Sequence, residues 1–164
     1  TGLPFLYFFA NNSGITANGY PGILLGPYVN VSNDSIFNAK DGYGLDSFDM
    51  TGINMSYNTN YPFWGNDNFS YSNFSYAMVR SYNNPDNYSY ANFEGANLTN
   101  ARLSMSTLTG VFGGNMIGPP PQGGLPAGWT FSNGQLFNPD GIGSNDPSIV
   151  AAGLAAQAAN ALLH

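Results

Sequence analysis

The side chains that could do chemistry in this chain are mainly amides, hydroxyls and phenols. Asparagine begins an Asn-x-Ser/Thr triplet at eight places, more than 23 Asn and 23 Ser and Thr residues would give at random among 164 positions. Such a triplet accepts N-linked glycans in proteins that follow a secretory route. The excess predicts glycosylation at two or more sites. The candidate acceptors are Asn11, Asn30, Asn33, Asn54, Asn68, Asn73, Asn87 and Asn97.

A weaker candidate site is a loop near the C-terminus that places oxygen ligands around glycines. Its alternating pattern loosely resembles a calcium-binding loop, but it lacks a bidentate glutamate and a full set of acidic residues. We therefore expect a turn followed by a helix cap, and keep calcium near Asn138, Asp140 and Asp146 as the alternative. No other cofactor is predicted.

Residue types that serve in catalysis are scarce. The chain has one histidine, His164, and no cysteine, so cysteine nucleophiles and zinc–thiolate sites are excluded. A catalytic histidine needs a scaffold that orients it, and a terminal residue seldom has one. The Gly-Gly pairs at 113–114 and 123–124 lack the lysine or the strand–helix context of a phosphate-binding loop. The sequence therefore predicts a protein that is not an enzyme.

Charge is also scarce. The basic residues are Lys40, Arg80 and Arg102, against nine acidic residues, and 7% of the chain is charged. Contacts to nucleic-acid phosphates need clustered basic side chains, so nucleic-acid binding is excluded. The apolar run 3–10 is far shorter than the roughly 20 residues that span a membrane. A surface rich in Asn, Ser and Tyr with little charge weakens repulsion between copies and indicates an extracellular or cell-surface protein.

The elements that must position these side chains are set by a five-residue repeat. It is clearest over residues 91–110, where each unit opens with a small residue and has a large apolar residue two places later. Neither a helix nor a simple strand produces this spacing. The run resembles the pentapeptide-repeat family, whose unit reads roughly Ala-Asp/Asn-Leu-x-x. The resemblance implies a right-handed quadrilateral β-helix, with one unit on each side and four to a coil.

In that family the central apolar residue and the small residue two places before it point inward. Weaker repeats upstream place Phe48 and Ile53 in a third set of central residues. The resemblance thus implies a β-helix core made of Phe69, Phe74, Tyr88, Phe93, Leu98, Leu103 and Leu108. We expect a mainly β protein with an apolar N-terminal β-rich arm at 1–42, the β-helix at 43–112, a Gly/Pro-rich connection with a hairpin at 113–146 and an Ala-rich helix at 147–164.

The two ends of the chain are the predicted places of assembly. The N-terminal arm either caps the first coil of its own β-helix or lends a strand to a neighbour, because exposed terminal coils carry unpaired backbone groups. In the C-terminal helix, an apolar stripe of Val150, Leu154, Ala158 and Leu162 either packs on its own subunit or is buried between subunits. The candidate assembly contacts are Leu3, Phe5, Leu6, Phe8, Phe9, Val150, Leu154 and Leu162.

These features predict a secreted structural subunit, glycosylated, that forms an extracellular filament or surface layer with copies of itself. Head-to-tail or strand-exchange contacts would join the copies, and repeated head-to-tail contacts give open filaments. One alternative is a monomeric β-helix that binds glycans or ice through exposed Tyr and Asn. The other is an intracellular scaffold.

Overall fold

The computed structural model describes residues 8–10, 23–25, 27–28, 30, 45–46, 49–58, 64–65, 67–79, 85–118 and 124–163. Short strands and bridges dominate, and one helix follows them. The elements are β1 Phe8–Ala10, β2 Ile23–Leu25, β3 Leu45–Asp46, β4 Trp64–Gly65, β5 Thr130–Ser132, β6 Gln135–Phe137 and α1 Pro147–Ala161.

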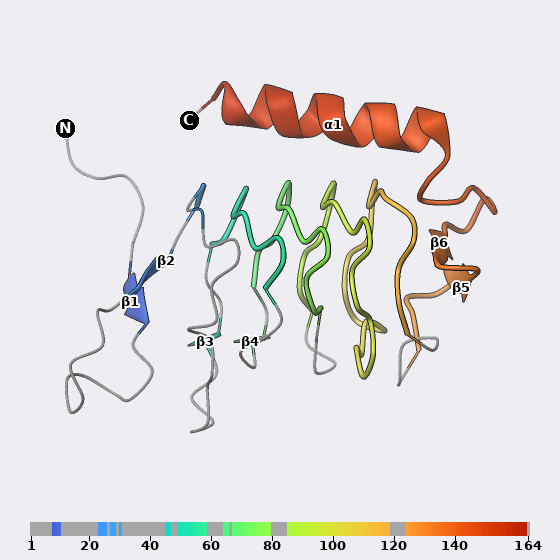
Figure 1. Cartoon of the computed structure of the whole chain (residues 1–164), viewed down its shortest axis with the longest axis horizontal. Coiled ribbons are helices and arrows are strands. Elements are labelled where there is room, and N and C mark those ends of the chain that lie inside the picture. The colour runs from blue at the N-terminus through green and yellow to red at the C-terminus, as the bar shows by residue number, and fades with distance from the viewer. Residues whose placement is uncertain are drawn as a thin grey trace.

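Parallel bridges join each stretch of chain to the stretch one coil later. Asn68 pairs with Asn87, a shift of 19 residues, and Asn92 pairs with Phe112, a shift of 20. The strands β3 and β4 pair in the same parallel sense. The chain therefore winds into a parallel β-helix, whose coils stand in a row in Figure 1.

The bridged coils extend beyond both ends of the predicted repeat region, 43–112. Asn30 pairs with Asn54 in the first described coil, and Asn97 pairs with Ile117 in the last. The units at these ends depart from the five-residue pattern in their side chains, yet their backbones still continue the ladder. The β-helix is therefore longer than the repeat pattern alone predicts.

One five-residue unit has a fixed geometry. Asn92 is a bridge residue, and its neighbours Ala91 and Phe93 are both buried. The Asn92 N–H donates to the preceding coil, at Ser72 O, and the Phe93 N–H donates to the next coil, at Phe112 O. The turn residues Glu94 and Gly95 then redirect the chain into the next unit, and we call such a two-residue turn a corner. Each unit therefore supplies both inward apolar side chains and backbone hydrogen bonds along the axis of the β-helix.

The core is a stack of the inward residues. All seven residues that the repeat pattern assigned to it are buried, with exposed fractions between 0 and 2%. Aromatic rings fill its middle part, where Phe69 and Tyr88 stack at 5.5 Å and Phe74 meets Phe93 edge to face at 5.8 Å. Such pairs stabilise beyond the area that they bury, by about 0.5–1.5 kcal/mol each.

The register of the third predicted set was wrong for Ile53. The structure places Met55, one residue after the bridge at Asn54, in the central position, and Ile53 one residue before it. Both inward positions can hold an apolar side chain, so the pattern alone left the choice open. Phe48 lies outside the described residues.

The C-terminal end of the β-helix is covered by the chain itself. The strands β5 and β6 form the predicted hairpin, with Asn133 and Gly134 in its turn. The Met116 N–H donates to Gly134 O, and the Gly113 N–H donates to Ser144 O, both at 2.9 Å. Backbone groups of the last coil are thereby paired, as burial requires.

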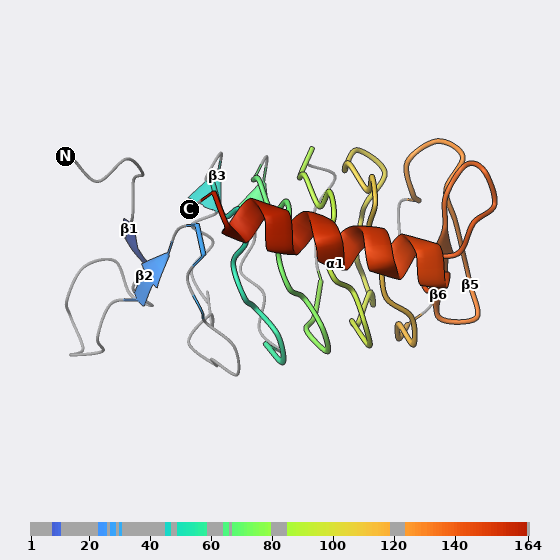
Figure 2. The ribbon, with the colours of Figure 1, turned by 90° about the horizontal axis from the view of Figure 1, so that it is seen from above.

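The helix α1 runs lengthwise beside the coils, from the hairpin end back toward the first coil (Figures 1 and 2). It begins as predicted, because the Asp146 carboxylate accepts the Ser148 N–H and Pro147 stands in the first turn. It ends at Ala161. The helix thereby touches residues from several coils at once.

The structure separates the two roles predicted for the apolar stripe of α1. Leu154 and Leu162 are 53% and 88% exposed, Val150 is half-buried, and Ala158 is exposed. Gly153 is the buried residue of the helix. The leucines of the stripe therefore do not pack on their own subunit, because the corners offer aromatic rings and carbonyl groups, which favour small and amide side chains. Burial of the stripe between subunits stays a prediction.

The N-terminal arm is described in part. The strand β1 pairs antiparallel with β2 of the same chain, in the register Phe8↔Leu25. In Figure 1 this pair lies beside the first coil, at the end opposite the β5–β6 hairpin. Of the predicted assembly contacts in this arm, Leu3, Phe5 and Leu6 lie outside the described residues.

Candidate functional site

The outer face of the β-helix carries columns of asparagine amides. Asn87 Nδ2 donates to Asn68 Oδ1 at 3.1 Å, and Asn68 Nδ2 donates to Asp49 Oδ1 at 3.2 Å. On the next side, Asn73 Nδ2 donates to Asn54 Oδ1 at 3.2 Å. These amides stand at the bridge positions, so the coil spacing brings each one within hydrogen-bond distance of the next.

The same asparagines also shape the corner that follows each of them. Asn68 Oδ1 accepts the N–H of Ser70, and Asn97 Oδ1 accepts the N–H of Thr99. This is the turn that an asparagine forms with the backbone two residues on. The Ser or Thr of the triplet therefore stands where the corner begins. The excess of Asn-x-Ser/Thr triplets inside the repeats has this structural cause.

The predicted glycan acceptors consequently differ in how their amide nitrogens are engaged. Those of Asn68, Asn73 and Asn87 donate to the preceding coil. Within the described residues, the amide nitrogens of Asn54 and Asn97 are not seen to donate. Asn30 is exposed at the first bridge. Asn11 and Asn33 lie outside the described residues.

Tyrosine and glycine share the corners. The corner residues adopt a left-handed backbone, with φ of 58° at Tyr90 and 66° at Gly110. An L side chain in this region costs roughly 1–2 kcal/mol. Tyr90 stacks on Tyr71 at 5.4 Å, and its ring also covers Gly110, where a Cβ would lie 2.5 Å from it. Ring stacking therefore compensates for the backbone strain.

The helix α1 packs against residues of several coils. A Cβ on Gly153 would lie 2.1 Å from the Phe112 ring, so only glycine allows this approach. Gln157 Nε2 donates to the carbonyls of Ser72 and Tyr90, at 3.2 and 3.0 Å. One side chain of α1 thereby joins two different coils.

The contact farthest along α1 joins it to the first described coil. Asn160 Nδ2 donates to the Tyr28 hydroxyl. Partial burial and the neighbouring Asp49 carboxylate raise the pKa of Tyr28, because both disfavour the phenolate. The protonated hydroxyl also donates to the Asn160 carbonyl oxygen, at 3.5 Å. The buried face of α1 is defined by Gly153, Gln157 and Asn160.

A second tyrosine column remains open to solvent. Tyr57 and Tyr76 stack at 5.0 Å with an interplanar angle of 12°, and they are 53% and 50% exposed. The Tyr76 ring lies over Gly95 in the next coil. This exposed aromatic pair was not singled out in the sequence, although the five-residue spacing from the corner at Tyr71 could have revealed it.

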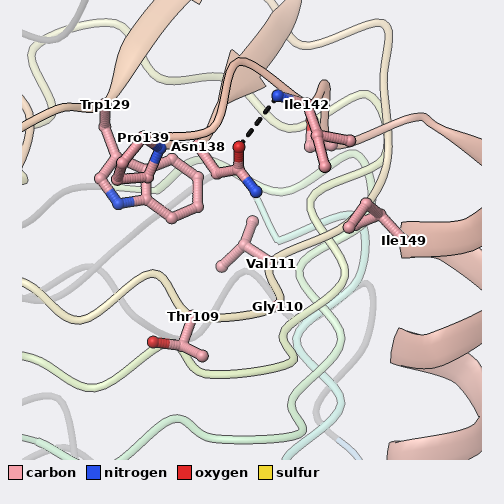
Figure 3. Close-up of a pocket in the computed structure, with 9 residues that line it drawn as sticks. Thr109, Gly110, Val111, Trp129, Asn138, Pro139, Ile142 and Ile149 are labelled. Carbon is pink, nitrogen blue, oxygen red and sulfur yellow. Dashed lines mark hydrogen bonds between the residues drawn. The ribbon is translucent and has the colours of Figure 1, made fainter.

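A cavity of about 260 Å³ opens beside the first turn of α1. Val111 of the last coil, Trp129, Ile142 and Ile149 supply its apolar walls. In Figure 3 Trp129 lies against Pro139, and Val111 and Ile149 face them from the other side. We call this cavity the Trp129 pocket. It was not predicted, because residues from four separate segments meet only in the folded chain.

Two of the three residues considered for calcium, Asn138 and Asp146, use side-chain oxygens in hydrogen bonds within the chain. Asn138 Oδ1 accepts the N–H groups of Asp140 and Ile142, at 3.0 and 2.9 Å, the second of which is drawn in Figure 3. Asp146 Oδ1 accepts from Ser148. These bonds make the turn and helix cap that were the preferred interpretation.

Asp146 has a role at α1 that is electrostatic as well as geometric. Hydrogen bonds from the Ser148 hydroxyl and the Ser148 N–H lower its pKa, since both stabilise the charged form. In the described part of the chain, no group of three or more His, Cys, Asp or Glu side chains lies close enough to hold a metal ion. Over the same residues, no helix combines the length and the apolar character that crossing a membrane requires.

Parallel bridges one coil apart, inward apolar pairs and left-handed corners define this protein as a β-helix. Residues 87–112 match the family described as pentapeptide repeats (8 copies). The chain thus carries the pentapeptide repeats of that family. The comparison with curated proteins found no match, nor did the comparison with solved structures.

Proposed function

We propose that this protein is a non-catalytic structural subunit that assembles with copies of itself into an extracellular filament or surface layer. The observation that carries the proposal is the outer face of α1. That face exposes Leu154, Leu162 and a series of alanines, and α1 has no charged side chain. Contiguous exposed apolar surface of this kind marks protein–protein contacts.

The β-helix itself would serve as the rigid body of the subunit. We infer a right-handed, four-sided form, as the resemblance to pentapeptide repeats implies. A bridge residue every five positions and a coil of 19 or 20 residues support four units to a coil. Such a body offers flat outer sides with fixed spacing, which suits a repeating lattice.

The distribution of charge affects which surfaces of two copies can come into contact. The chain has a net charge of −6 but few charged side chains, so two copies repel each other only weakly. The outer face of α1 adds no charge of its own to that repulsion. Stacking of coils end to end is disfavoured at the hairpin end, because β5 and β6 already cover it. Contact through a side of the subunit is therefore favoured.

Glycosylation remains part of the proposal, with a preferred order of sites. Attachment replaces one hydrogen of the amide nitrogen and needs that nitrogen accessible. Asn54 and Asn97 meet this need better than Asn68, whose Nδ2 donates to Asp49 and Thr51. We expect mass spectrometry of native material to find glycans at Asn97 before Asn68. A native mass equal to the unmodified chain would contradict this part of the proposal.

Self-association is tested by the dependence of mass on concentration. Sedimentation velocity and light scattering on the purified chain should show species larger than the monomer as concentration rises. Leu154→Asp, which places a carboxylate on the outer face of α1, should reduce them. A chain that stays monomeric at high concentration would refute self-assembly.

The exposed Tyr57–Tyr76 pair favours a second function, the binding of neutral glycans. Aromatic faces contact the apolar faces of sugar rings, and the nearby amides could donate to hydroxyl groups. Titration with neutral oligosaccharides, followed by tyrosine fluorescence, tests this function. Binding that Tyr76→Ala abolishes would support it, and an unchanged signal in the wild-type chain would exclude it.

A further inference from the structure

The Trp129 pocket has a hydrogen-bond donor in its wall. Asn138 Oδ1 accepts the N–H groups of Asp140 and Ile142, so the other end of this amide is its NH₂ group. In Figure 3 that nitrogen points away from its loop and toward Val111, between the Trp129 ring and Ile142. Within the described residues, no protein acceptor takes a bond from it. A ligand in the pocket would therefore meet a donor whose direction the loop already fixes.

The rest of the wall is neutral and mostly apolar. Ser144 is buried, and its hydroxyl donates to Gly113 O at 2.6 Å and accepts the Leu136 N–H at 3.3 Å. Among the described residues that line the pocket, none is ionisable. A charged ligand would lose its hydration there without meeting an opposite charge. The pocket therefore favours a neutral molecule that carries an apolar group close to an acceptor oxygen.

The volume of the pocket limits the size of that molecule. About 260 Å³ is several times the roughly 30 Å³ that a water molecule occupies in the liquid. It lies below the roughly 300–1,000 Å³ of pockets for drug-sized ligands and cofactors. The pocket thus suits one small ring with a short substituent, and a longer ligand would enter it with one unit.

We propose that the Trp129 pocket binds one residue of a neutral N-acetylated sugar, with N-acetylglucosamine as the probe. The acetamido group combines a methyl group, which would contact Val111 and Ile149, with a carbonyl oxygen that would accept from Asn138 Nδ2. The indole ring of Trp129 offers an apolar surface to the C–H groups of the sugar ring. A plain hexose lacks the methyl group, and glucosamine carries a charge that the wall does not balance. The acetamido group is therefore the part that the pocket recognises.

This site goes beyond self-assembly, because a single chain supplies its whole wall. Its sugar has two sources in principle, a glycan on a neighbouring copy and a sugar from the surroundings. The affinity for one sugar residue is expected to be modest. At the ligand efficiency of drug-sized molecules, about 15 non-hydrogen atoms give a dissociation constant on the order of 1 mM.

The first experiment titrates the purified, unglycosylated chain with N-acetylglucosamine and follows its ¹⁵N–¹H spectrum. The signals of Trp129, Ile142 and Ile149 should shift and saturate in the millimolar range. Glucose, glucosamine and N-methylacetamide, each of which lacks one part of the ligand, should bind at least tenfold more weakly. The absence of a saturable shift would overturn the site. Equal binding of glucose would overturn recognition of the acetamido group, and equal binding of N-methylacetamide would overturn recognition of the sugar ring.

Asn138→Asp tests the donor. The new carboxylate can still accept the two N–H groups of the turn, so folding should persist, but it cannot donate to a carbonyl oxygen. Binding of N-acetylglucosamine should weaken at least tenfold. Asn133→Asp is the matched control, because it makes the same change at an exposed position of the β5–β6 turn, outside the pocket lining. Binding by Asn138→Asp that equals the wild type would overturn the proposed contact.

Ile142→Ala tests the apolar wall. Ile142 is 40% exposed, so the shortened side chain should be tolerated, and binding should weaken several-fold. Ile117→Ala shortens the same side chain at a 58% exposed position of the last coil that does not line the pocket. It should leave binding unchanged. Equal losses in the two variants would show that the sugar binds elsewhere.

Native, glycosylated material identifies the source of the sugar. If the pocket holds a glycan of a neighbouring copy, excess free N-acetylglucosamine should lower the mass of native assemblies in light scattering, whereas excess glucose should not. An unchanged mass would assign the ligand to the surroundings. The site and the proposed assembly fail separately. Saturable binding by a chain that stays monomeric supports the site and refutes self-assembly, and assembly of a chain that shows no binding does the reverse.

Discussion

Corner residues decide how tightly successive coils can stack. At Gly52, Gly95 and Gly110 the left-handed backbone coincides with a tyrosine ring from the preceding coil, leaving no room for a Cβ. Glycine is required there for two separate reasons, the backbone and the ring. At other corners a tyrosine adopts the left-handed backbone, and the stacking of its ring offsets the free-energy cost of that conformation.

Replacing Gly110 by alanine separates these two reasons. We expect Gly110→Ala to lower the free energy of unfolding by more than the roughly 1–2 kcal/mol that the left-handed backbone alone costs. The added Cβ would lie 2.5 Å from the Tyr90 ring. Urea unfolding followed by circular dichroism measures the difference.

The matched control for that substitution is Gly141→Ala. Gly141 has φ of 77°, and nothing lies within 4 Å of an added Cβ. Only the backbone cost should appear in this variant. Equal losses in the two variants would show that the Tyr90 ring moves aside freely.

Protonation of Asp146 should loosen the start of α1. Its folded-state pKa is lowered, so the stability it contributes is present above its ordinary value of 3.8 and is lost as pH falls through the folded pKa. Helix ellipticity should therefore decline below about pH 4 in the wild type. Asp146→Asn keeps an acceptor without the charge and should remove this dependence. An identical acid profile in the variant would assign the loss to other carboxylates.

At the scale of elements, α1 is held by side chains that a leucine-rich helix would lack. Gly153 admits the Phe112 ring, and Gln157 donates to carbonyls of two coils. An apolar stripe predicted from periodicity assumes an apolar partner surface. Here the partner surface consists of corners that present carbonyls, so the helix presents its polar and smallest residues inward and its leucines outward.

A large side chain at Gly153 should lift α1 from the coils. We expect Gly153→Leu to raise the hydrogen-exchange rate of α1 amides by at least tenfold, because Phe112 occupies the space. The coils should keep their β-sheet signal. Ala152→Leu inserts the same side chain at an exposed position and should leave exchange unchanged. Protection retained in Gly153→Leu would mean that the helix slides rather than lifts.

Much of the fold could be predicted because the strongest repeats are local. The spacing over residues 91–110 located the inward positions of Phe93 and Leu98, and the Asn133-Gly134 pair located the hairpin. The site features that were missed depend on contacts between distant segments. The Trp129 pocket needs the last coil, the hairpin loops and α1 together, and no local pattern encodes that meeting.

The triplets show how one pattern can have two causes. Asn68 and Ser70 match a glycan acceptor, and they also form the amide turn at a corner. Sequence alone could not separate these meanings, because the same three residue types satisfy both. The structure supplies the missing distinction, namely which amide nitrogens already donate to the preceding coil.

At the scale of the whole molecule, the two ends of the β-helix differ. The hairpin end is closed by backbone hydrogen bonds that Gly134 and Ser144 accept from the last coil. The other end lies beside the β1–β2 pair (Figure 1). Copies of such a body are expected to meet through their sides, where the outer face of α1 is exposed.

The bonds from α1 to separate coils also have a mechanical consequence. A row of stacked repeats under tension would ordinarily peel from one end, one coil at a time. Here Asn160 holds the first described coil at Tyr28 while Gly153 is seated against Phe112 of the last. The helix therefore links the first and last coils, and part of a pulling force passes through it. A subunit pulled from its ends should therefore unfold in one large event rather than in a series of small events, one for each coil.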